Sequence, residues 1–173
     1  MSESIDDREL AEFWAAARGF AGVGSMDVVV GETPLGVVPP PAWSFGDSPE
    51  LADALLGQVL SGAKTATSTA LWEFEAGDEP LPTVGDVSIV LDGAGHPRAL
   101  LRTTDVRVVL FSEVDEEFAA AEGEDDGSLT AWRASHEAYF RRRATDEGGQ
   151  PFAEDLPVVL EEFELRYPHL SGK

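Results

Sequence analysis

The sequence LLGQVLSGAKTATS, residues 55–68, joins the end of one predicted helix to the start of a predicted strand. The helix begins at Ser48-Pro49, because serine is a favoured N-cap residue and proline suits the first helical position. Gly62 is typical of the residue that ends a helix in a left-handed conformation. The segment TATSTALW, residues 65–72, is rich in threonine and predicts a strand. The buried face of the helix would carry Leu51, Leu55, Leu56, Val59 and Leu60.

Lys64 and Thr67 lie at this junction and are candidate catalytic residues. The chain contains 12 basic residues but only two lysines, Lys64 and the terminal Lys173. Because arginine cannot lose its proton whereas lysine can, a single internal lysine indicates that an amine is needed there. A lysine in a dehydrated site can take the proton of a threonine hydroxyl and make that hydroxyl a nucleophile. The pairing requires a turn or bulge, since strand positions three apart face opposite sides.

The same residues allow simpler interpretations. Arginine-rich codon usage could leave one lysine by chance, and Lys64 could be a surface residue beside threonines that favour a strand. Gly57 and Gly62 nearly form a phosphate-binding loop with this lysine, but that pattern requires lysine directly after the second glycine. Ala63 intervenes and Gly57 falls inside the predicted helix, so a phosphate-binding loop is not predicted.

The remaining elements alternate irregularly between helices and strands. Short polar turns join several strands, which favours antiparallel pairing, and no regular strand–helix–strand alternation supports a doubly wound sheet. We therefore predict an α+β fold in which a small mixed β-barrel is decorated by helices. Residues 1–40 form a predicted N-terminal helical arm that packs on a main body of residues 41–173. Helices are predicted at 6–18, 114–122 and 129–143, a short apolar segment at 26–30, and strands at 87–91, 99–111 and 158–167.

The segment around Glu122 is a second candidate for function. Ser112 is the expected N-cap of the preceding helix, and Gly123 ends that helix directly after Glu122. A carboxylate at this position could orient an amine or relay a proton. The acidic residues 122–126 could instead bind a divalent cation, but they lack the spacing of a calcium loop, and a solvated loop is the simpler interpretation. No metal site is predicted.

His136, Trp132 and Tyr139 would share one face of the helix that follows. They could form a stacking and hydrogen-bonding wall of a ligand site, or belong to the core around a hydrogen-bonded histidine. The histidines of the chain are scattered too widely to predict a metal site.

Charge and composition restrict the classes of function. The formal net charge is −21 at pH 7, so the chain repels polyanions, and tight binding to duplex DNA or long RNA is not expected. A small or neutral ligand such as a nucleoside remains compatible with that charge.

The absence of cysteine excludes disulfides and thiolate chemistry. No apolar run approaches the roughly 20 residues that cross a bilayer, and the acidic N-terminus is unlike a signal peptide, so a cytoplasmic protein without a membrane partner is expected.

The ordered set of segments resembles the larger bacterial members of the ASCH domain family. LLGQVLSGAKTATS matches the Gly-x-Lys-x-x-Thr pattern that follows a helix in this family. PAWSFGDS, residues 41–48, precedes that helix as it does in the family. FAAAEGEDDGSLTAWRASHEAYF, residues 118–140, resembles the family's acidic linker and Trp-x-x-x-His helix, and the closing FELRYP also fits.

The resemblance implies a PUA-like β-barrel with a ligand cleft beside the lysine segment. The family is widely proposed to bind RNA, some small members are amidohydrolases that remove the acetyl group of N4-acetylcytidine, and one bacterial relative is similar to a ribonuclease. By correspondence with the amidohydrolases, the expected catalytic residues are Lys64, Thr67 and Glu122. The residues expected to bind the ligand are Trp43, Phe45, Ser68, Trp132 and His136.

A nucleoside-like small molecule or a short RNA is the expected partner, and no cofactor is expected. The chain is longer than the small amidohydrolases and strongly acidic, which disfavours polymeric RNA and allows a different small substrate. A non-catalytic RNA- or nucleotide-binding module and a ribonuclease are the alternatives to an amidohydrolase.

Overall fold

The computed structural model describes residues 6–22 and 38–168. The chain divides into two compact units, each built from separated segments of the sequence. Unit 1 consists of residues 1–62, 85–102 and 164–173, and unit 2 consists of residues 63–84 and 103–163.

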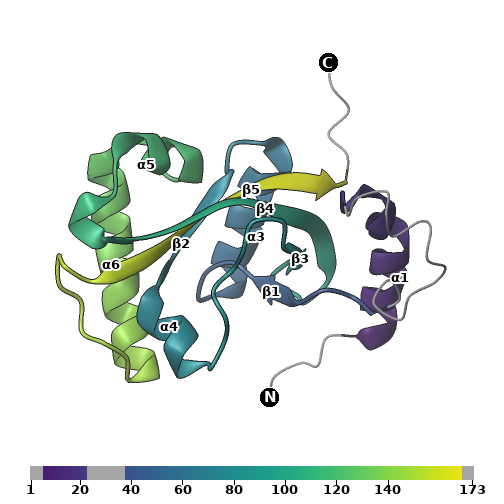
Figure 1. Ribbon diagram of the computed structural model, residues 1–173, viewed down its shortest axis with the longest axis horizontal. Coiled ribbons are helices and arrows are strands. Elements are labelled where there is room, and N and C mark those ends of the chain that lie inside the picture. Colours follow the sequence, from purple (N-terminus) through teal and green to yellow (C-terminus); the bar gives the residue numbers. More distant parts are fainter. Residues whose placement is uncertain (1–5, 23–37, 169–173) are drawn as a thin grey trace. The chain divides into compact units, whose positions relative to one another are not determined.

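The described elements are helices, short 3-10 turns and strands (Figure 1). The helices are α1 (Asp7–Ala17), α3 (Pro49–Ser61), α4 (Leu71–Ala76), α5 (Glu116–Glu122) and α6 (Leu129–Glu147). The 3-10 turns are η1 (Arg18–Phe20) and η2 (Phe111–Glu113). The strands are β1 (Ala42–Ser44), β2 (Ala66–Ala70), β3 (Val87–Leu91), β4 (Pro97–Leu110) and β5 (Pro157–Tyr167).

The strands form a mixed, 5-stranded sheet in the order β1-β3-β4-β5-β2. β1 pairs with β3 in parallel, whereas β3 with β4 and β2 with β5 pair antiparallel. A tight turn joins β3 to β4, so the antiparallel pairing expected from the sequence is confirmed there. β4 and β5 are long enough to contribute residues to both units.

The core of unit 1 includes residues of α1, β3 and β4. Asp6 caps α1, because its side chain accepts hydrogen bonds from the first backbone N–H groups of the helix. Trp14 and Ala17 on the buried face of α1 cluster with Ile89 and Leu100. The amphipathic helix predicted near the N-terminus is therefore present and buries its apolar face.

The core of unit 2 is built mainly from α5, α6, β2 and β5. Phe118 on α5, Trp132 and Phe140 on α6, and Leu160 on β5 are all buried in it. Phe111 lies beside two of these rings, with centroid separations of 5.2 Å to Trp132 and 6.3 Å to Phe140. This packing holds α5, α6 and β2 together and thereby positions the polar site that they share.

Two predictions are wrong: the position at which β2 ends, and the absence of a strand in the segment before α3. The strand predicted over residues 65–72 ends at Ala70, and α4 begins at Leu71, so that Trp72 enters the unit 2 core from a helix. β1 occupies part of the proline-rich connector, where no strand was predicted. Its backbone partners lie on β3, a contact that is distant in sequence and invisible to local pattern.

The N-cap of α5 is also corrected. Asp115 caps this helix, because its side chain accepts the backbone N–H of Phe118 at 2.8 Å. Ser112, the expected cap, lies in η2. Both residue types favour N-cap positions, so local propensity alone could not choose between them. The apolar segment 26–30 lies outside the described residues.

Candidate functional site

Lys64 is held in place by backbone hydrogen bonds of the residue that follows it. The N–H and hydroxyl of Thr65 both donate to the carbonyl oxygen of Ala121, at 2.8 and 3.2 Å. The carbonyl of Thr65 accepts the N–H of Phe163 at 2.9 Å. The segment before β2 is thus tied to the end of α5 and to β5. Lys64 itself is only 1% exposed, which is unusual for a lysine.

Gly123 brings the end of α5 against the lysine segment. Its φ of +64° lies in the left-handed region, and it follows the last helical residue, Glu122. A Cβ at this position would lie 2.0 Å from the carbonyl oxygen of Ala63, a distance that no side chain tolerates. The glycine is therefore required both by the backbone conformation and by the close approach of two backbones. The reversal of the chain at Gly123 directs Glu122 and Glu124 toward Lys64.

The amine of Lys64 lies between two carboxylates. Its Nζ is 2.7 Å from Oε1 of Glu124 and 3.6 Å from Oε1 of Glu122. It also donates to the backbone carbonyl of Glu122 at 3.5 Å. The side chains of Lys64 and Glu122 are 0% and 1% exposed, whereas that of Glu124 is 20% exposed. Glu124 is therefore the member of this group that solvent reaches most readily.

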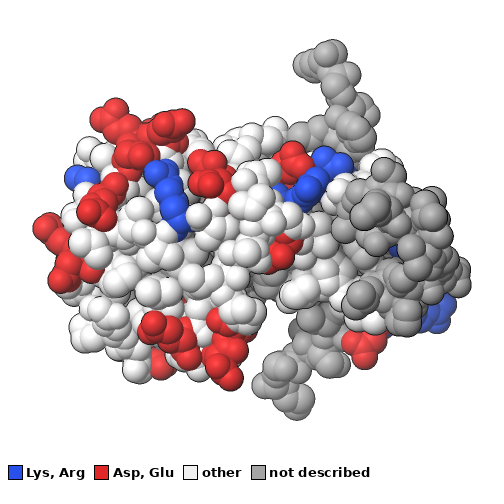
Figure 2. All heavy atoms as spheres, viewed as in Figure 1, with Lys and Arg blue, Asp and Glu red and all other residues white. Residues whose placement is uncertain are grey.

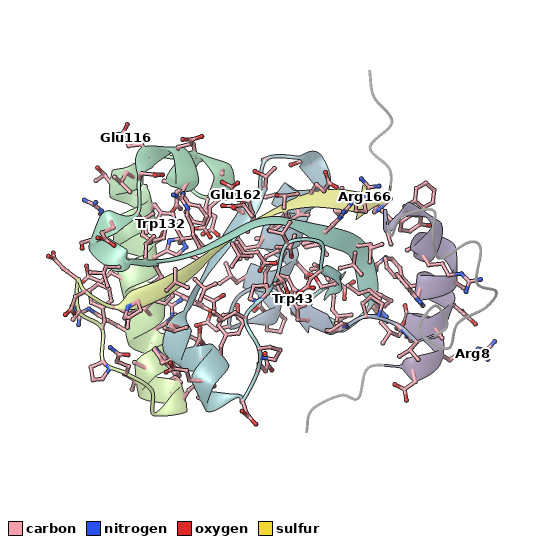
Figure 3. The ribbon with its side chains drawn as sticks, in the orientation of Figure 1. Arg8, Trp43, Glu116, Trp132, Glu162 and Arg166 are labelled. Carbon is pink, nitrogen blue, oxygen red and sulfur yellow. The ribbon has the colours of Figure 1, made fainter. Side chains whose placement is uncertain are left out.

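Glu122 is a buried carboxylate with a full set of partners. The hydroxyl of Ser68 lies 3.3 Å from both of its oxygens. The indole N–H of Trp132 donates to Oε2, and Nε2 of His136 is 2.9 Å from the same oxygen. Trp132 extends from α6 on the side of α5 (Figure 3). Because buried carboxylates are costly unless paired and hydrogen-bonded, this arrangement accounts for the burial of Glu122.

His136 is positioned as a doubly protonated imidazolium. Its Nδ1 lies 2.9 Å from the carbonyl oxygen of Trp132, and its Nε2 faces the Glu122 carboxylate. Both of these partners are acceptors only, so each ring nitrogen must carry a hydrogen to make both bonds. The imidazole also stacks on the Trp132 indole, with centroids 4.2 Å apart and an interplanar angle of 14°. Both side chains are buried, which agrees with the alternative of a hydrogen-bonded histidine in the core. A ligand-binding role for Trp132 and His136 stays a prediction.

The electrostatics of the cluster favour the charged forms of Glu122 and His136. Burial alone raises the pKa of Glu122, but the charges of Lys64 and His136 and the hydrogen bonds from His136 and Trp132 outweigh it and lower the pKa to about 2. Burial alone lowers the pKa of His136, but the charge and hydrogen bond of Glu122, with a smaller effect of Glu124, raise that pKa above 6.5. The shifts of both pKa values therefore favour a protonated imidazole beside an ionised carboxylate.

Thr67 lies on the other face of β2 from Ser68. Ala66, Ser68 and Ala70 are buried, whereas Thr67 and Thr69 are partly exposed, as the alternation of a regular strand requires. The hydroxyl that meets Glu122 is that of Ser68. The predicted catalytic pairing of Lys64 with Thr67 stays a prediction.

The aromatic residues predicted to line the pocket divide between the units. Trp132 belongs to unit 2 and contacts Glu122. Trp43 and Phe45 belong to unit 1, where their rings form an edge-to-face pair with centroids 4.6 Å apart. A ligand-binding role for Trp43 and Phe45 stays a prediction.

Two carboxylates near β2 and α5 were not predicted as site residues from the sequence. Glu124 makes the shortest contact with Lys64, and its signal was its position one residue beyond the helix-ending glycine. Glu161 on β5 is the register partner of Thr67 and accepts the hydroxyl of Thr103 at 2.6 Å. No local signal marks Glu161, because the pairing of β2 with β5 joins residues almost a hundred positions apart.

Three of the site residues could together contact a metal ion. Glu122, Glu124 and His136 offer ligand atoms that all lie within 4.8 Å of one another. The amine of Lys64, 2.7 Å from Glu124, already supplies a positive charge at this point. A divalent cation would have to displace this amine and the proton of His136, since metal binding requires the neutral imidazole. The donor set therefore fits an ion pair better than a metal centre.

The fold and the site together define a PUA-like α+β domain with a buried cluster of ionisable side chains. The model of the ASCH domain family matches residues 41–167, most of the chain. The chain therefore belongs to the ASCH domain family, and the PUA-like fold class predicted from the sequence is confirmed. Domains of this family are RNA-binding-like, which makes RNA or nucleotide-like molecules the class of ligand that membership suggests.

Two solved structures are similar over nearly the whole chain. Protein EF3133 from Enterococcus faecalis V583, described as a DUF984 protein, is 31% identical with a TM-score of 0.73, over 91% of this chain and 88% of that one. The ASCH domain from Lactobacillus crispatus JV V101 is 26% identical with a TM-score of 0.75, over 96% and 98% of the two chains. No match is found among the curated proteins. Among the helices described, none is long and apolar enough to cross a membrane.

Proposed function

We propose that the protein binds a nucleoside-like small molecule and hydrolyses an amide on it, as in N4-acetylcytidine. The observation that supports this most directly is the convergence of Lys64, Glu122, Glu124 and His136 in one nearly dehydrated cluster. Ionisable side chains with perturbed pKa values, gathered away from water, are characteristic of acid–base sites. A purely structural ion pair needs one cation and one carboxylate, whereas this cluster contains two of each.

The proposed chemistry begins with transfer of the Lys64 ammonium proton to Glu124, the partly exposed neighbour. Thr67 lies on the face of β2 opposite Glu122, so the neutral amine must leave Glu122 and move around the edge of the sheet. It then accepts the hydroxyl proton of Thr67 while Thr67 Oγ bonds to the acyl carbon. The C–N bond breaks as Lys64 returns that proton to the leaving nitrogen. Water then hydrolyses the acyl–Thr67 ester, which releases the carboxylic acid and restores the hydroxyl, and Glu124 returns its proton to Lys64. In the resting site the charges of Lys64 and His136 lower the pKa of Glu122 to about 2, and the ionised carboxylate holds His136 in place.

The experiment compares hydrolysis of N4-acetylcytidine by the wild type, Lys64→Ala and Thr67→Ala. We expect turnover by the wild type and a loss of at least about a hundredfold in each variant, the usual range for general acid–base groups. Thr69→Ala is the matched control, because Thr69 lies on the same face of β2 two residues further along. Equal rates in all four proteins, or turnover by none of them, would remove the proposal.

A non-catalytic RNA- or nucleotide-binding module is the second candidate, and the RNA-binding-like character of the family favours it. In that case Lys64 would contact a phosphate rather than move a proton. Lys64→Arg separates the two, because arginine keeps the positive charge but cannot act as a base. Retained binding of a short RNA, together with a steep loss of that binding as salt is added, would favour the binding module.

A further inference from the structure

The pleat of β2 separates two sets of polar residues in unit 2. Ser68 faces Glu122, whereas Thr67 lies on the opposite face. In the antiparallel register of β2 and β5, Thr67 is paired directly with Glu161. Directly opposed residues on neighbouring strands have Cβ atoms about 4.5–5.5 Å apart, so these two side chains are neighbours on that face. The carboxylate beside Thr67 is therefore Glu161.

Glu161 is oriented by a further threonine. The hydroxyl of Thr103, on β4, donates to its Oε1 at 2.6 Å, a short hydrogen bond typical of an ionised acceptor. Thr103 is only 5% exposed, whereas Glu161 and Thr67 are partly exposed. A buried hydroxyl thus fixes the carboxylate, and the more accessible partners are the two that a ligand could reach. A carboxylate has two oxygens and can accept several hydrogen bonds at once.

The strand around Glu161 provides apolar surroundings. Val159 and Phe163 are two residues before and after it on β5, and therefore share its face. They are 1% and 5% exposed. A carboxylate between apolar side chains interacts more strongly with an N–H donor than a carboxylate in water does. Such a group discriminates against ligands that present an acceptor instead, because two facing acceptors repel.

We propose that Thr67, Thr103 and Glu161 form the part of the ligand site that recognises the exocyclic N–H of a cytosine-type base. Glu161 accepts this N–H, and Thr103 holds Glu161 in position. In an N-acylated base the acyl carbon is bonded to the same nitrogen, so this hydrogen bond places that carbon beside Thr67. The inference rests on the proposed function for its ligand class, and adds a binding residue, Glu161, on the face opposite Glu122.

The test is binding, which does not depend on turnover. Isothermal titration with cytidine and N4-acetylcytidine is compared with uridine, which presents a carbonyl in place of the exocyclic N–H. The variant is Glu161→Gln. The matched control is Glu162→Gln, because Glu162 is the adjacent carboxylate on β5 and pairs with Ala66 on the other face. Thermal denaturation of both variants establishes that they are folded.

We expect wild type and Glu162→Gln to bind both cytosine nucleosides at least tenfold more tightly than uridine. Glu161→Gln should lose at least tenfold in affinity for the cytosine nucleosides and most of the discrimination against uridine. Equal losses in the two variants, or no preference of the wild type for an N–H donor, overturn the inference. Selective binding without any hydrolysis would leave this site standing and remove the amidohydrolase proposal, so the two failures are distinguishable.

Discussion

His136 and Glu122 form a buried imidazolium–carboxylate pair whose energy depends on pH. Their contact of 2.9 Å is supported by the hydrogen bond from Nδ1 to the Trp132 carbonyl at the same distance. The pKa of His136 is raised above 6.5 in the folded protein, so the folded state binds its proton more tightly than the unfolded state. The stabilisation is complete below pH 6.5 and is lost as the pH rises through the folded-state pKa. The pKa of Glu122 is lowered from 4.5 to about 2, so its contribution is lost only in acid, as the pH falls through that range.

We therefore predict that replacing His136 by asparagine destabilises the protein most in mildly acidic solution. The replacement should cost about 3–5 kcal/mol there, the usual cost of removing one partner of a buried pair. The difference in free energy of unfolding between wild type and His136→Asn should shrink as the pH is raised above 6.5. Denaturant titrations from about pH 5.5 to pH 9 measure it. A difference that is constant or that grows with pH would show that His136 is neutral in the folded protein.

At the scale of elements, the end of α5 determines whether the ionisable cluster forms. Thr65 is bonded to the carbonyl of Ala121, and Gly123 packs against the carbonyl of Ala63. These contacts let two backbone segments approach without intervening side chains. The carboxylates on either side of Gly123 then reach the amine of Lys64.

Gly123→Ala should disrupt this arrangement more than the same change at Gly148. Both glycines end helices with nearly the same φ, +64° and +65°, so both alanine variants should lose about 1–2 kcal/mol to the left-handed conformation. A Cβ at Gly148 meets nothing within 4 Å, whereas one at Gly123 lies 2.0 Å from the Ala63 carbonyl oxygen. We expect Gly123→Ala to be the less stable by several kcal/mol, as measured by denaturant unfolding. Equal stabilities would mean that the two backbones are not in close contact.

At the scale of the whole molecule, charge restricts the partners. The net charge is −21, and acidic side chains are prominent on the face drawn in Figure 2, with a few arginines among them. Lys64, the one internal lysine, is buried against carboxylates. Attraction of a long polyanion needs a field of basic residues that this composition does not supply.

We predict that duplex DNA is not bound at physiological ionic strength, and that nucleoside binding is nearly independent of salt. The physical reason is that a nucleoside carries no phosphate and releases no counterions. Fluorescence anisotropy with labelled duplex DNA and calorimetry with N4-acetylcytidine at about 50 and 200 mM salt test the two parts. Submicromolar DNA binding that weakens steeply with salt would contradict the prediction.

Much of the fold was predictable from short-range signals. The helix from Pro49 to Ser61 could be read from its serine cap, its apolar spacing and its terminal glycine, because caps and periodicity involve neighbouring residues. The same holds for α6, which runs from Leu129 to Glu147. The two strands β3 and β4 were recognised for a similar reason, since a tight turn between apolar runs favours a hairpin. The three-residue strand β1 was missed, because only its partner on β3 makes it a strand.

The sequence by itself indicated the family, every described helix except α4, and the candidate pair Lys64 and Glu122, whose side chains lie 3.6 Å apart in the structure. Only the tertiary structure decided which hydroxyl of β2 faces Glu122, and that Glu161 lies beside Thr67. A strand places successive side chains on opposite faces. A shift of one residue in the register of β2 against β5 would therefore move every side chain of β2 to the other face. The register that sets this shift comes from packing between segments far apart in the chain, which local sequence does not encode.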